Sequence, residues 1–328
     1  MSHSNCIQPL GRTVRLRLFV RHVIFLTLIF ASLTFPLTGQ EAVFRSDTRL
    51  VVLHTTVVDR NGKLLTDLLQ NAFKIYENNV EQEIRLFRHE DVPISLGLVI
   101  DNSASMRQKR QKVEAAALQL VKASNPQDEV FIVNFSDSAF LDCPFTHNIA
   151  KLQEGLARID SRGATAMRDA IGMSINYMKS NAKLDKKILL VVSDGDDNLS
   201  ESTLEQVIRQ AQQAEVLIYA IGLLAEEDRG SARQAQKALD TITGATGGAP
   251  YYPKELAEVD QIALQVAHEV RNQFTIGYSP SQQTLDGSLR QIRVAVEGPN
   301  QPVARTRTGY YATPAPRAKP AVSGGPLK

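Results

Sequence analysis

Two hydrophobic periodicities alternate along residues 93–271. Short, mostly apolar runs are typical of strands buried on both faces of a parallel sheet, and they lie at 94–100, 130–135, 188–192 and 216–221. Between and after these runs, apolar residues recur at the spacing of amphipathic helices, in stripes at 113–121, 149–156, 166–178, 204–211 and 256–270. Strands that alternate with helices predict a doubly wound α/β fold with a parallel central sheet.

The segments that flank this region show strand patterns only. Before it, strand patterns with turn signals between them lie at 50–58, 73–76 and 84–87. After it, further strand patterns lie at 274–278, 292–296 and 303–311. A few short strands are marginal alone, so we expect residues 40–92 and 272–312 to pair into one small β domain. The α/β domain of residues 93–271 would then be an insertion between its halves, and the Pro-rich segment 313–328 is expected to be disordered.

The first 39 residues have the pattern of an export signal. Four arginines and no acidic residue come before an apolar run at 23–35, which ends at Pro36. This length and these flanks fit a signal peptide better than a membrane span. No clean Ala-x-Ala precedes residue 40, so an uncleaved N-terminal anchor stays open as the alternative. The protein is expected to be exported (periplasmic, cell-surface or secreted), with membrane contact only through this segment.

The composition limits which classes of partner and which disulfides can be expected. Without residues 1–39 the formal net charge changes from +2 to −2, which argues against a nucleic-acid partner. The chain has no tryptophan and 6% aromatic residues, so a platform of stacked aromatic rings is not expected. Cys6 lies in the predicted signal, which leaves Cys143 without an internal disulfide partner. We expect Cys143 to be a partly buried small hydrophobe.

Oxygen-bearing side chains follow two of the predicted strands. Asp101, Ser103 and Ser105 come directly after the first strand of the α/β region, Asp194 follows the third, and Thr165 stands in a loop between them. Ligands of doubly wound sheets bind at the carboxyl ends of strands, and hard divalent cations take carboxylate, hydroxyl and water oxygens. Two carboxylates only balance such an ion, so a position stays open for a carboxylate from a partner protein. The alternative is that these side chains merely cap helices.

This set resembles the metal-ion-dependent adhesion site (MIDAS) of the von Willebrand factor type A (VWA) domain family. The family's Asp-x-Ser-x-Ser motif, later Thr and later Asp are matched by Asp101, Ser103, Ser105, Thr165 and Asp194. The resemblance covers about residues 94–270. It implies a Rossmann-like fold, a Mg²⁺ ion (with Mn²⁺ or Ca²⁺ as alternatives) and recognition of a protein ligand. With its flanking strands, the chain looks like bacterial exported VWFA-related proteins.

Other chemistries have weaker support in the sequence. Residues 194–198 mimic an EF-hand loop, but Leu199 stands where that loop needs glycine. The glycine-rich stretch 244–248 is expected to be a helix stop rather than a phosphate cradle, and there is no Gly-x-Ser-x-Gly elbow. We therefore expect a non-enzymatic, metal-dependent adhesion or assembly module. A metal-free scaffold and a metal-assisted hydrolase are the alternatives. The basic residues at 107–112 are expected to be solvated. The acidic pair 196–197 is expected to be solvated or to modulate the potential near the site.

Overall fold

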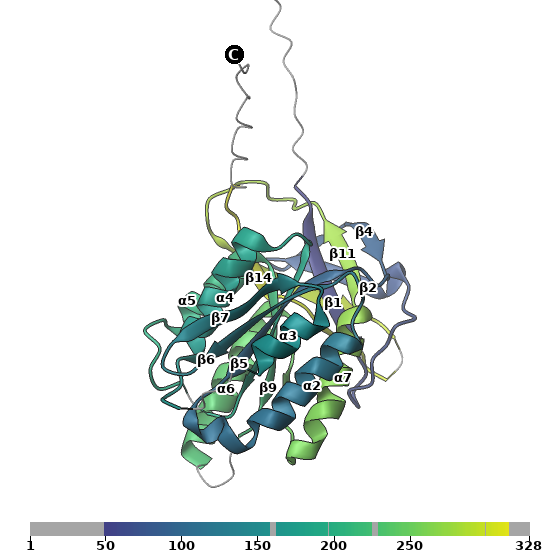
Figure 1. Cartoon of the computed structure of the whole chain (residues 1–328). Coiled ribbons are helices and arrows are strands. Elements are labelled where there is room, and N and C mark those ends of the chain that lie inside the picture. The colour runs from purple at the N-terminus through teal and green to yellow at the C-terminus, as the bar shows by residue number, and fades with distance from the viewer. Residues whose placement is uncertain (1–48, 158–161, 196, 225–228, 299, 315–328) are drawn as a thin grey trace, which may run out of the picture. The chain divides into compact units, whose positions relative to one another are not determined.

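The computed structural model describes residues 49–157, 162–195, 197–224, 229–298 and 300–314 (Figure 1). The predicted export signal at 1–39 and the tail beyond residue 314 lie outside the described residues. All of these described residues fall in one compact unit. This unit contains an α/β domain and a β-sandwich built from the segments on either side of it.

A six-stranded sheet forms the centre of the α/β domain, with the strand order β10-β9-β8-β5-β6-β7. Strands β5 (Ile94–Asp101), β6 (Glu129–Phe135), β8 (Lys186–Ser193), β9 (Val216–Gly222) and β10 (Pro250–Tyr251) are parallel. All eight residues of β5 are buried, as expected for a parallel strand with a helical layer on each face. The predicted fold is confirmed, with one addition: β7 (Ala139–Thr146) pairs antiparallel at the edge of the sheet.

Helices cover both faces of this sheet (Figure 1). One apolar core lies under α2 (Arg110–Lys122), α3 (Ile149–Leu156) and α7 (Val259–Arg271). The other lies under α4 (Met167–Asn181), α5 (Leu204–Ala214) and α6 (Arg229–Thr246). Three short 3₁₀ helices complete the helical elements of the described residues: η1 (Gln70–Ala72), η2 (Ala104–Gln108) and η3 (Leu256–Glu258). The expected helix over 256–270 thus begins only at Val259.

The flanking segments form two four-stranded sheets rather than one. The first has the order β13-β1-β11-β4, and the second has the order β14-β12-β2-β3. Their strands are β1 (Val51–Val58), β2 (Phe73–Glu77), β3 (Val80–Gln82), β4 (Ile84–Arg88), β11 (Phe274–Tyr278), β12 (Leu289–Val296), β13 (Val303–Arg305) and β14 (Gly309–Tyr311). The single strand expected at 303–311 is wrong, because its two ends belong to different sheets.

Strands from before and after the α/β domain pair directly in both sheets. Leu53 of β1 lies opposite Ile276 of β11, and Ile75 of β2 lies opposite Val294 of β12. The two sheets share one apolar core, in which the rings of Phe73 and Phe274 lie 5.0 Å apart. Packing across the two sheets explains how such short strands become stable together.

Candidate functional site

The carboxyl ends of β5 and β8 bring the two candidate aspartates together. These strands are neighbours in register, with Ile100 opposite Val192. Asp101 is the last residue of β5, and Asp194 follows the last residue of β8. Asp101 is fully buried and Asp194 is 7% exposed. Both carboxylates therefore lie at the edge where ligands of doubly wound sheets bind.

Hydrogen bonds join four of the five predicted residues. Asp101 accepts from the Ser103 backbone N–H at 2.8 Å, and the Ser103 and Ser105 hydroxyl oxygens lie 3.1 Å apart. The Ser105 hydroxyl then donates to Asp194 Oδ1 at 2.8 Å. The sharp turn after β5, followed by η2, places both serines beside the carboxylates. The result is a continuous row of oxygen atoms from β5 to β8.

Thr165 is positioned by the loop that follows Asp194. Its backbone N–H donates to Asn198 Oδ1 at 3.0 Å, and its carbonyl accepts from the Asn198 N–H at 3.1 Å. A Cβ atom at Gly195 would lie 3.7 Å from Thr165 Oγ1, so the hydroxyl faces the turn after β8. Helix α4 begins after Ala166 without a side-chain cap. The alternative in which Thr165 caps this helix is therefore wrong.

The electrostatics of Asp101 suit a cation. Burial raises the pKa of its carboxyl, and the nearby Asp194 charge raises it further, whereas hydrogen bonds from Ser193 and Ser103 lower it. The donor set of carboxylates and neutral hydroxyls has the chemistry of a hard-cation site. Among the described residues, no cluster of three or more His, Cys, Asp or Glu side chains is placed to hold a metal ion.

Residues 96–196 match the family model for the von Willebrand factor type A domain. The chain carries a VWA domain. All five predicted site residues fall inside the matched range. Mouse integrin alpha-11 is 30% identical over 109 residues, which cover 31% of this chain and 9% of the integrin. The chain thus corresponds to a small part of that relative.

Several solved structures also resemble this chain. A von Willebrand factor type A protein from Catenulispora acidiphila is 16% identical, with a TM-score of 0.48, over 82% of this chain and 64% of its own. BatB from Bacteroides thetaiotaomicron is 16% identical, with a TM-score of 0.45, over 54% and 98% of the two chains. The domain of the pilus tip protein Mfa5 from Porphyromonas gingivalis is 15% identical, with a TM-score of 0.44, over 55% and 97%.

Three residues around the candidate site were not expected to contribute to it. The Ser193 hydroxyl donates to Asp101 Oδ2 at 2.6 Å. Lys109 Nζ lies 2.7 Å from Asp194 Oδ2, and Arg110 is 1% exposed. The expectation that the basic residues at 107–112 are solvated is therefore wrong for the last two. Their position one helical turn beyond the Asp-x-Ser-x-Ser segment was the signal that could have revealed them.

Of the two alternatives for the acidic pair 196–197, solvation is wrong for Asp197. The Asp197 side chain is 4% exposed and pairs with Arg168, whose Nε lies 3.1 Å from Asp197 Oδ2. Asp197 also accepts from the Ser200 hydroxyl at 2.7 Å. It therefore fixes the loop that carries Asn198, the partner of Thr165, rather than facing solvent. Asp196 lies outside the described residues.

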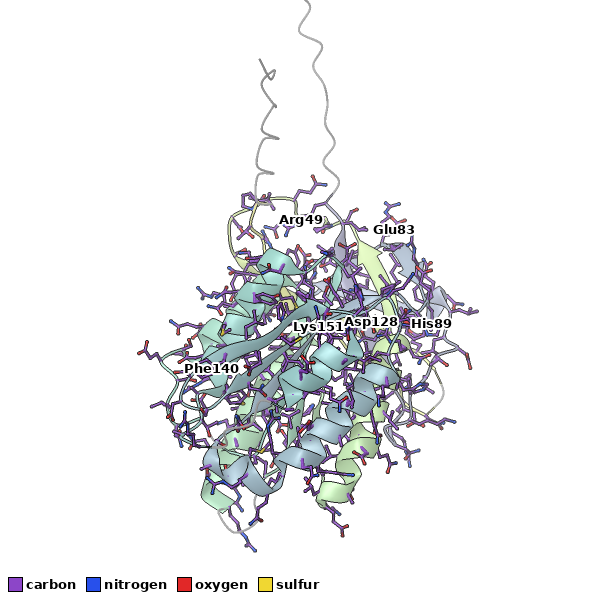
Figure 2. The ribbon with its side chains drawn as sticks, viewed as in Figure 1. Arg49, Glu83, His89, Asp128, Phe140 and Lys151 are labelled. Atoms are coloured by element: carbon purple, nitrogen blue, oxygen red, sulfur yellow. The ribbon has the colours of Figure 1, made fainter. Side chains whose placement is uncertain are left out.

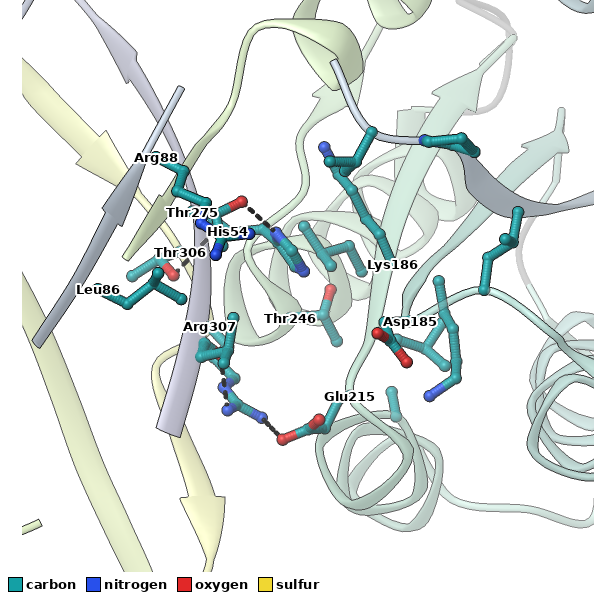
Figure 3. Close-up of a pocket in the computed structure, with 18 of the residues that line it drawn as sticks. His54, Leu86, Arg88, Asp185, Lys186, Glu215, Thr246, Thr275, Thr306 and Arg307 are labelled. Atoms are coloured by element: carbon teal, nitrogen blue, oxygen red, sulfur yellow. Dashed lines mark hydrogen bonds and ion pairs between the residues drawn. The ribbon is translucent and has the colours of Figure 1, made fainter. Parts of the chain in front are cut away.

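A separate cavity of about 520 Å³ lies between the sandwich and the amino ends of β8 and β9 (Figure 3). It is at the opposite end of these strands from Asp101. Several of its charged groups have partners within the chain: Arg307 pairs with Glu215 at 2.9 Å, and Lys186 Nζ donates to the Val270 carbonyl at 2.6 Å. The row of oxygens at the other end of the sheet remains the better candidate site.

Three further observations concern residues and helices outside the candidate site. Cys143 is 5% exposed and lies in an apolar core, as predicted. Phe140, on the edge strand β7, is 59% exposed (Figure 2). In the described part of the chain, no helix is both long and apolar enough to cross a membrane.

Proposed function

We propose that this chain is a metal-dependent protein-binding module for adhesion or assembly, with Asp101, Ser103, Ser105, Thr165 and Asp194 as the metal site. The observation that carries the proposal is the row of hydrogen-bonded oxygens between β5 and β8. Two carboxylates and neutral hydroxyls suit Mg²⁺, with Mn²⁺ or Ca²⁺ as alternatives. The match to the VWA family supports the same class of function.

In this proposal the chain's own residues have distinct roles. Asp101 and Asp194 supply negative charge, while Ser103, Ser105 and Thr165 supply neutral oxygens that add none. Ser193 and the Ser103 backbone N–H hold the Asp101 carboxylate in one orientation. A bound divalent ion would offer an open, electrophilic position to a carboxylate of a protein partner. Such a bridge requires no general base and no chemical step, in agreement with a non-enzymatic role.

The location of the protein follows from its N-terminal segment. We propose that the chain is exported by residues 1–39 and acts in the periplasm, at the cell surface or after secretion. An uncleaved segment would tie the module to the membrane. The proposed partner is therefore a protein met outside the cytoplasm that presents an acidic side chain.

Titration calorimetry with Mg²⁺ and Mn²⁺ on the chelator-treated chain tests the metal site. We expect saturable binding that Asp101→Ala abolishes and that Asp101→Asn, which keeps the size but not the charge, strongly weakens. Asp286→Asn is the matched control, because it removes an exposed carboxylate that pairs with Arg290, far along the sequence from the site. Binding that survives Asp101→Ala, in a folded protein, would contradict the proposed ligand set.

One observation favours the metal-free scaffold as the second candidate. Lys109 already neutralises Asp194 within the chain, so the acidic pair does not depend on an external cation for all of its charge balance. A folded chain that binds neither ion, and that keeps its partner in the presence of chelator, would support the scaffold.

A further inference from the structure

The Asp194 carboxylate, which follows β8, forms an ion pair with Lys109 of the same chain. Lys109 Nζ lies 2.7 Å from Asp194 Oδ2 and 3.2 Å from the carbonyl oxygen of Leu223. The Lys109 side chain is 28% exposed, whereas the Asp194 side chain is 1% exposed. A pair with one partner out of water is screened by salt much less than a surface pair. Lys109 is therefore part of the electrostatics of the site, not of the solvated surface.

A second positive charge lies in the same turn of the chain. The next residue, Arg110, is 1% exposed, and its guanidinium donates to Asn134 Oδ1 at 2.6 Å. Burial lowers the pKa of Arg110, and the charges of Glu114, Asp101 and Asp142 oppose this lowering. Lys109 therefore offsets the charge of Asp194, and Arg110 adds a second positive charge that Asp101 feels electrostatically.

The local backbone fixes this arrangement. Helix η2 ends at Gln108 and α2 begins at Arg110, so Lys109 stands at the junction of the two helices. Its backbone N–H donates to the Met106 carbonyl at 2.9 Å, and Met106 is fully buried. This anchor holds the base of the side chain beside the turn that follows β5. The ammonium consequently shares Asp194 with the Ser105 hydroxyl, each on a different carboxylate oxygen.

We propose that Lys109 is a tethered counter-ion that competes with the divalent cation for Asp194 and thereby lowers the metal affinity of the site. This inference rests on the proposed function. A divalent ion bound near Asp194 would stand a few ångströms from the ammonium, and like charges at that separation repel strongly in a partly buried site. The ion therefore binds when the ammonium moves toward solvent, or when an arriving carboxylate compensates the extra charge. The second route makes metal and an acidic partner bind cooperatively.

Calorimetric titration of Mn²⁺ into the chelator-treated chain tests this competition. Lys109→Met removes the charge and the donor, while Lys109→Gln removes the charge and keeps a donor. The matched control is Lys112→Met, which removes one positive charge from the same helix, where Lys112 pairs with Asp260 of α7. We expect both variants at position 109 to bind Mn²⁺ about tenfold more tightly than the parent or better, and Lys112→Met to bind as the parent does.

A second measurement separates charge competition from a structural effect. In chelator, Lys109→Met should melt at a lower temperature than the parent, because Asp194 has lost its counter-ion. Saturating Mn²⁺ should raise its melting temperature by more than that of the parent. Adding Asp101→Ala to Lys109→Met should abolish the Mn²⁺ response, which would locate the ion at this site. If Lys109→Met does not fold, the Mn²⁺ affinity is compared between the parent and Lys109→Gln instead.

The outcomes distinguish this inference from the function on which it rests. If the parent binds Mn²⁺ saturably and with an affinity equal to or higher than that of both variants at position 109, the proposed competition is wrong. The proposed metal site would still be supported. No saturable binding by the parent or by either variant, all folded by circular dichroism, would remove the proposed metal site and the competition together. Tighter binding by the variants, including binding found only in them, would support both.

Discussion

Ser193 shows how a residue that is not an expected metal ligand still determines the site. Its hydroxyl donates to Asp101 Oδ2 at 2.6 Å, and it is 1% exposed. The hydrogen bond from Ser193 lowers the pKa of the Asp101 carboxyl, in opposition to burial. A buried carboxylate is costly unless it is hydrogen-bonded. Ser193 therefore contributes to keeping Asp101 charged and oriented for a cation.

Ser193→Ala should consequently destabilise the protein. The variant leaves a buried carboxylate one donor short, which typically costs about 1–3 kcal/mol. Ser174→Ala is the matched control: Ser174 is also fully buried, but its hydroxyl donates to the Ala170 carbonyl within α4, an interaction that contributes little to helix stability. Urea unfolding of both variants measures the difference. Equal stability of the two variants would show that Asp101 does not depend on Ser193.

Strand β5 shows why its exact sequence matters at the scale of the element. Gly97 lies in the middle of this fully buried strand. A Cβ atom at this position would lie 2.4 Å from Leu189 Cδ2 and 2.4 Å from Phe131 Cζ. The side chains of both neighbouring strands thus close over the glycine, and no larger residue fits without displacing them. Since β5 ends at Asp101, such a displacement would be transmitted toward the candidate site.

Gly97→Ala should destabilise the protein by roughly 1–3 kcal/mol, the usual cost of overpacking a core. Gly244→Ala offers the matched control, because a Cβ there meets no atom within 4 Å and Gly244 lies within α6. That change should be neutral or stabilising by up to ~1 kcal/mol, since alanine is the better helix former. Thermal or urea unfolding compares the two. A Gly97→Ala variant as stable as Gly244→Ala would contradict the tight packing around β5.

The elements that could be predicted from the sequence are those with strong periodicity. The buried strands β5, β6, β8 and β9 are short apolar runs bounded by polar segments, and they lie where they were expected. Helix α6 was not predicted, although it has 18 residues. Its buried apolar positions are few, chiefly Ala235, Leu239 and Ile242, so its stripe is weak. Strand β7 escaped prediction because an edge strand is only partly buried.

The oxygen-bearing residues of the candidate site could be predicted from the sequence, but its basic residues, Lys109 and Arg110, could not. Asp101, Ser103, Ser105 and Asp194 follow predicted strands, and the structure brings them together. Whether they bind metal stays a prediction. The inward orientation of Lys109 and Arg110 depends on the 3₁₀ turn of η2. A 3₁₀ turn contains fewer residues than an α-helical turn, so it changes the direction in which the following side chains point. The spacing of apolar residues along the sequence does not reveal this change.

At the scale of the whole molecule, the sandwich and the α/β domain are joined by polar contacts as well as by chain connections. Gln273 Nε2 donates to Thr56 Oγ1 at 3.0 Å and to Tyr219 Oη at 3.1 Å, and so links β1 to β9. His54 of β1 faces the cavity near the amino end of β8 (Figure 3). Because β1 pairs with strands that come more than 200 residues later, its environment depends on the complete fold.

His54 should make this junction sensitive to acid. Burial, assisted by the positive charges of Lys186, Arg307 and Lys187, lowers the pKa of His54 from 6.5 to about 3. Acidic Asp185, Glu90 and Glu215 also line the cavity, but they do not outweigh these effects. Below pH 6.5 the unfolded chain binds a proton on His54 that the folded chain does not. Its contribution is therefore fully present above pH 6.5 and is lost as the pH falls toward 3.

Urea unfolding at pH 7.5 and pH 4.5 tests this prediction when the parent is compared with His54→Gln. Between these pH values the parent should lose about 3 kcal/mol more stability than the variant, at roughly 1.4 kcal/mol per pH unit below 6.5. The same carboxylates titrate in both proteins, so their contribution to the pH dependence cancels when the two proteins are compared. His147→Gln is the control, because His147 is exposed and does not line the cavity, and it should keep the pH dependence of the parent. Equal pH dependence in the parent and His54→Gln would mean that His54 gains its proton in the folded protein as readily as in the unfolded chain, and that the junction between sandwich and α/β domain admits the charge.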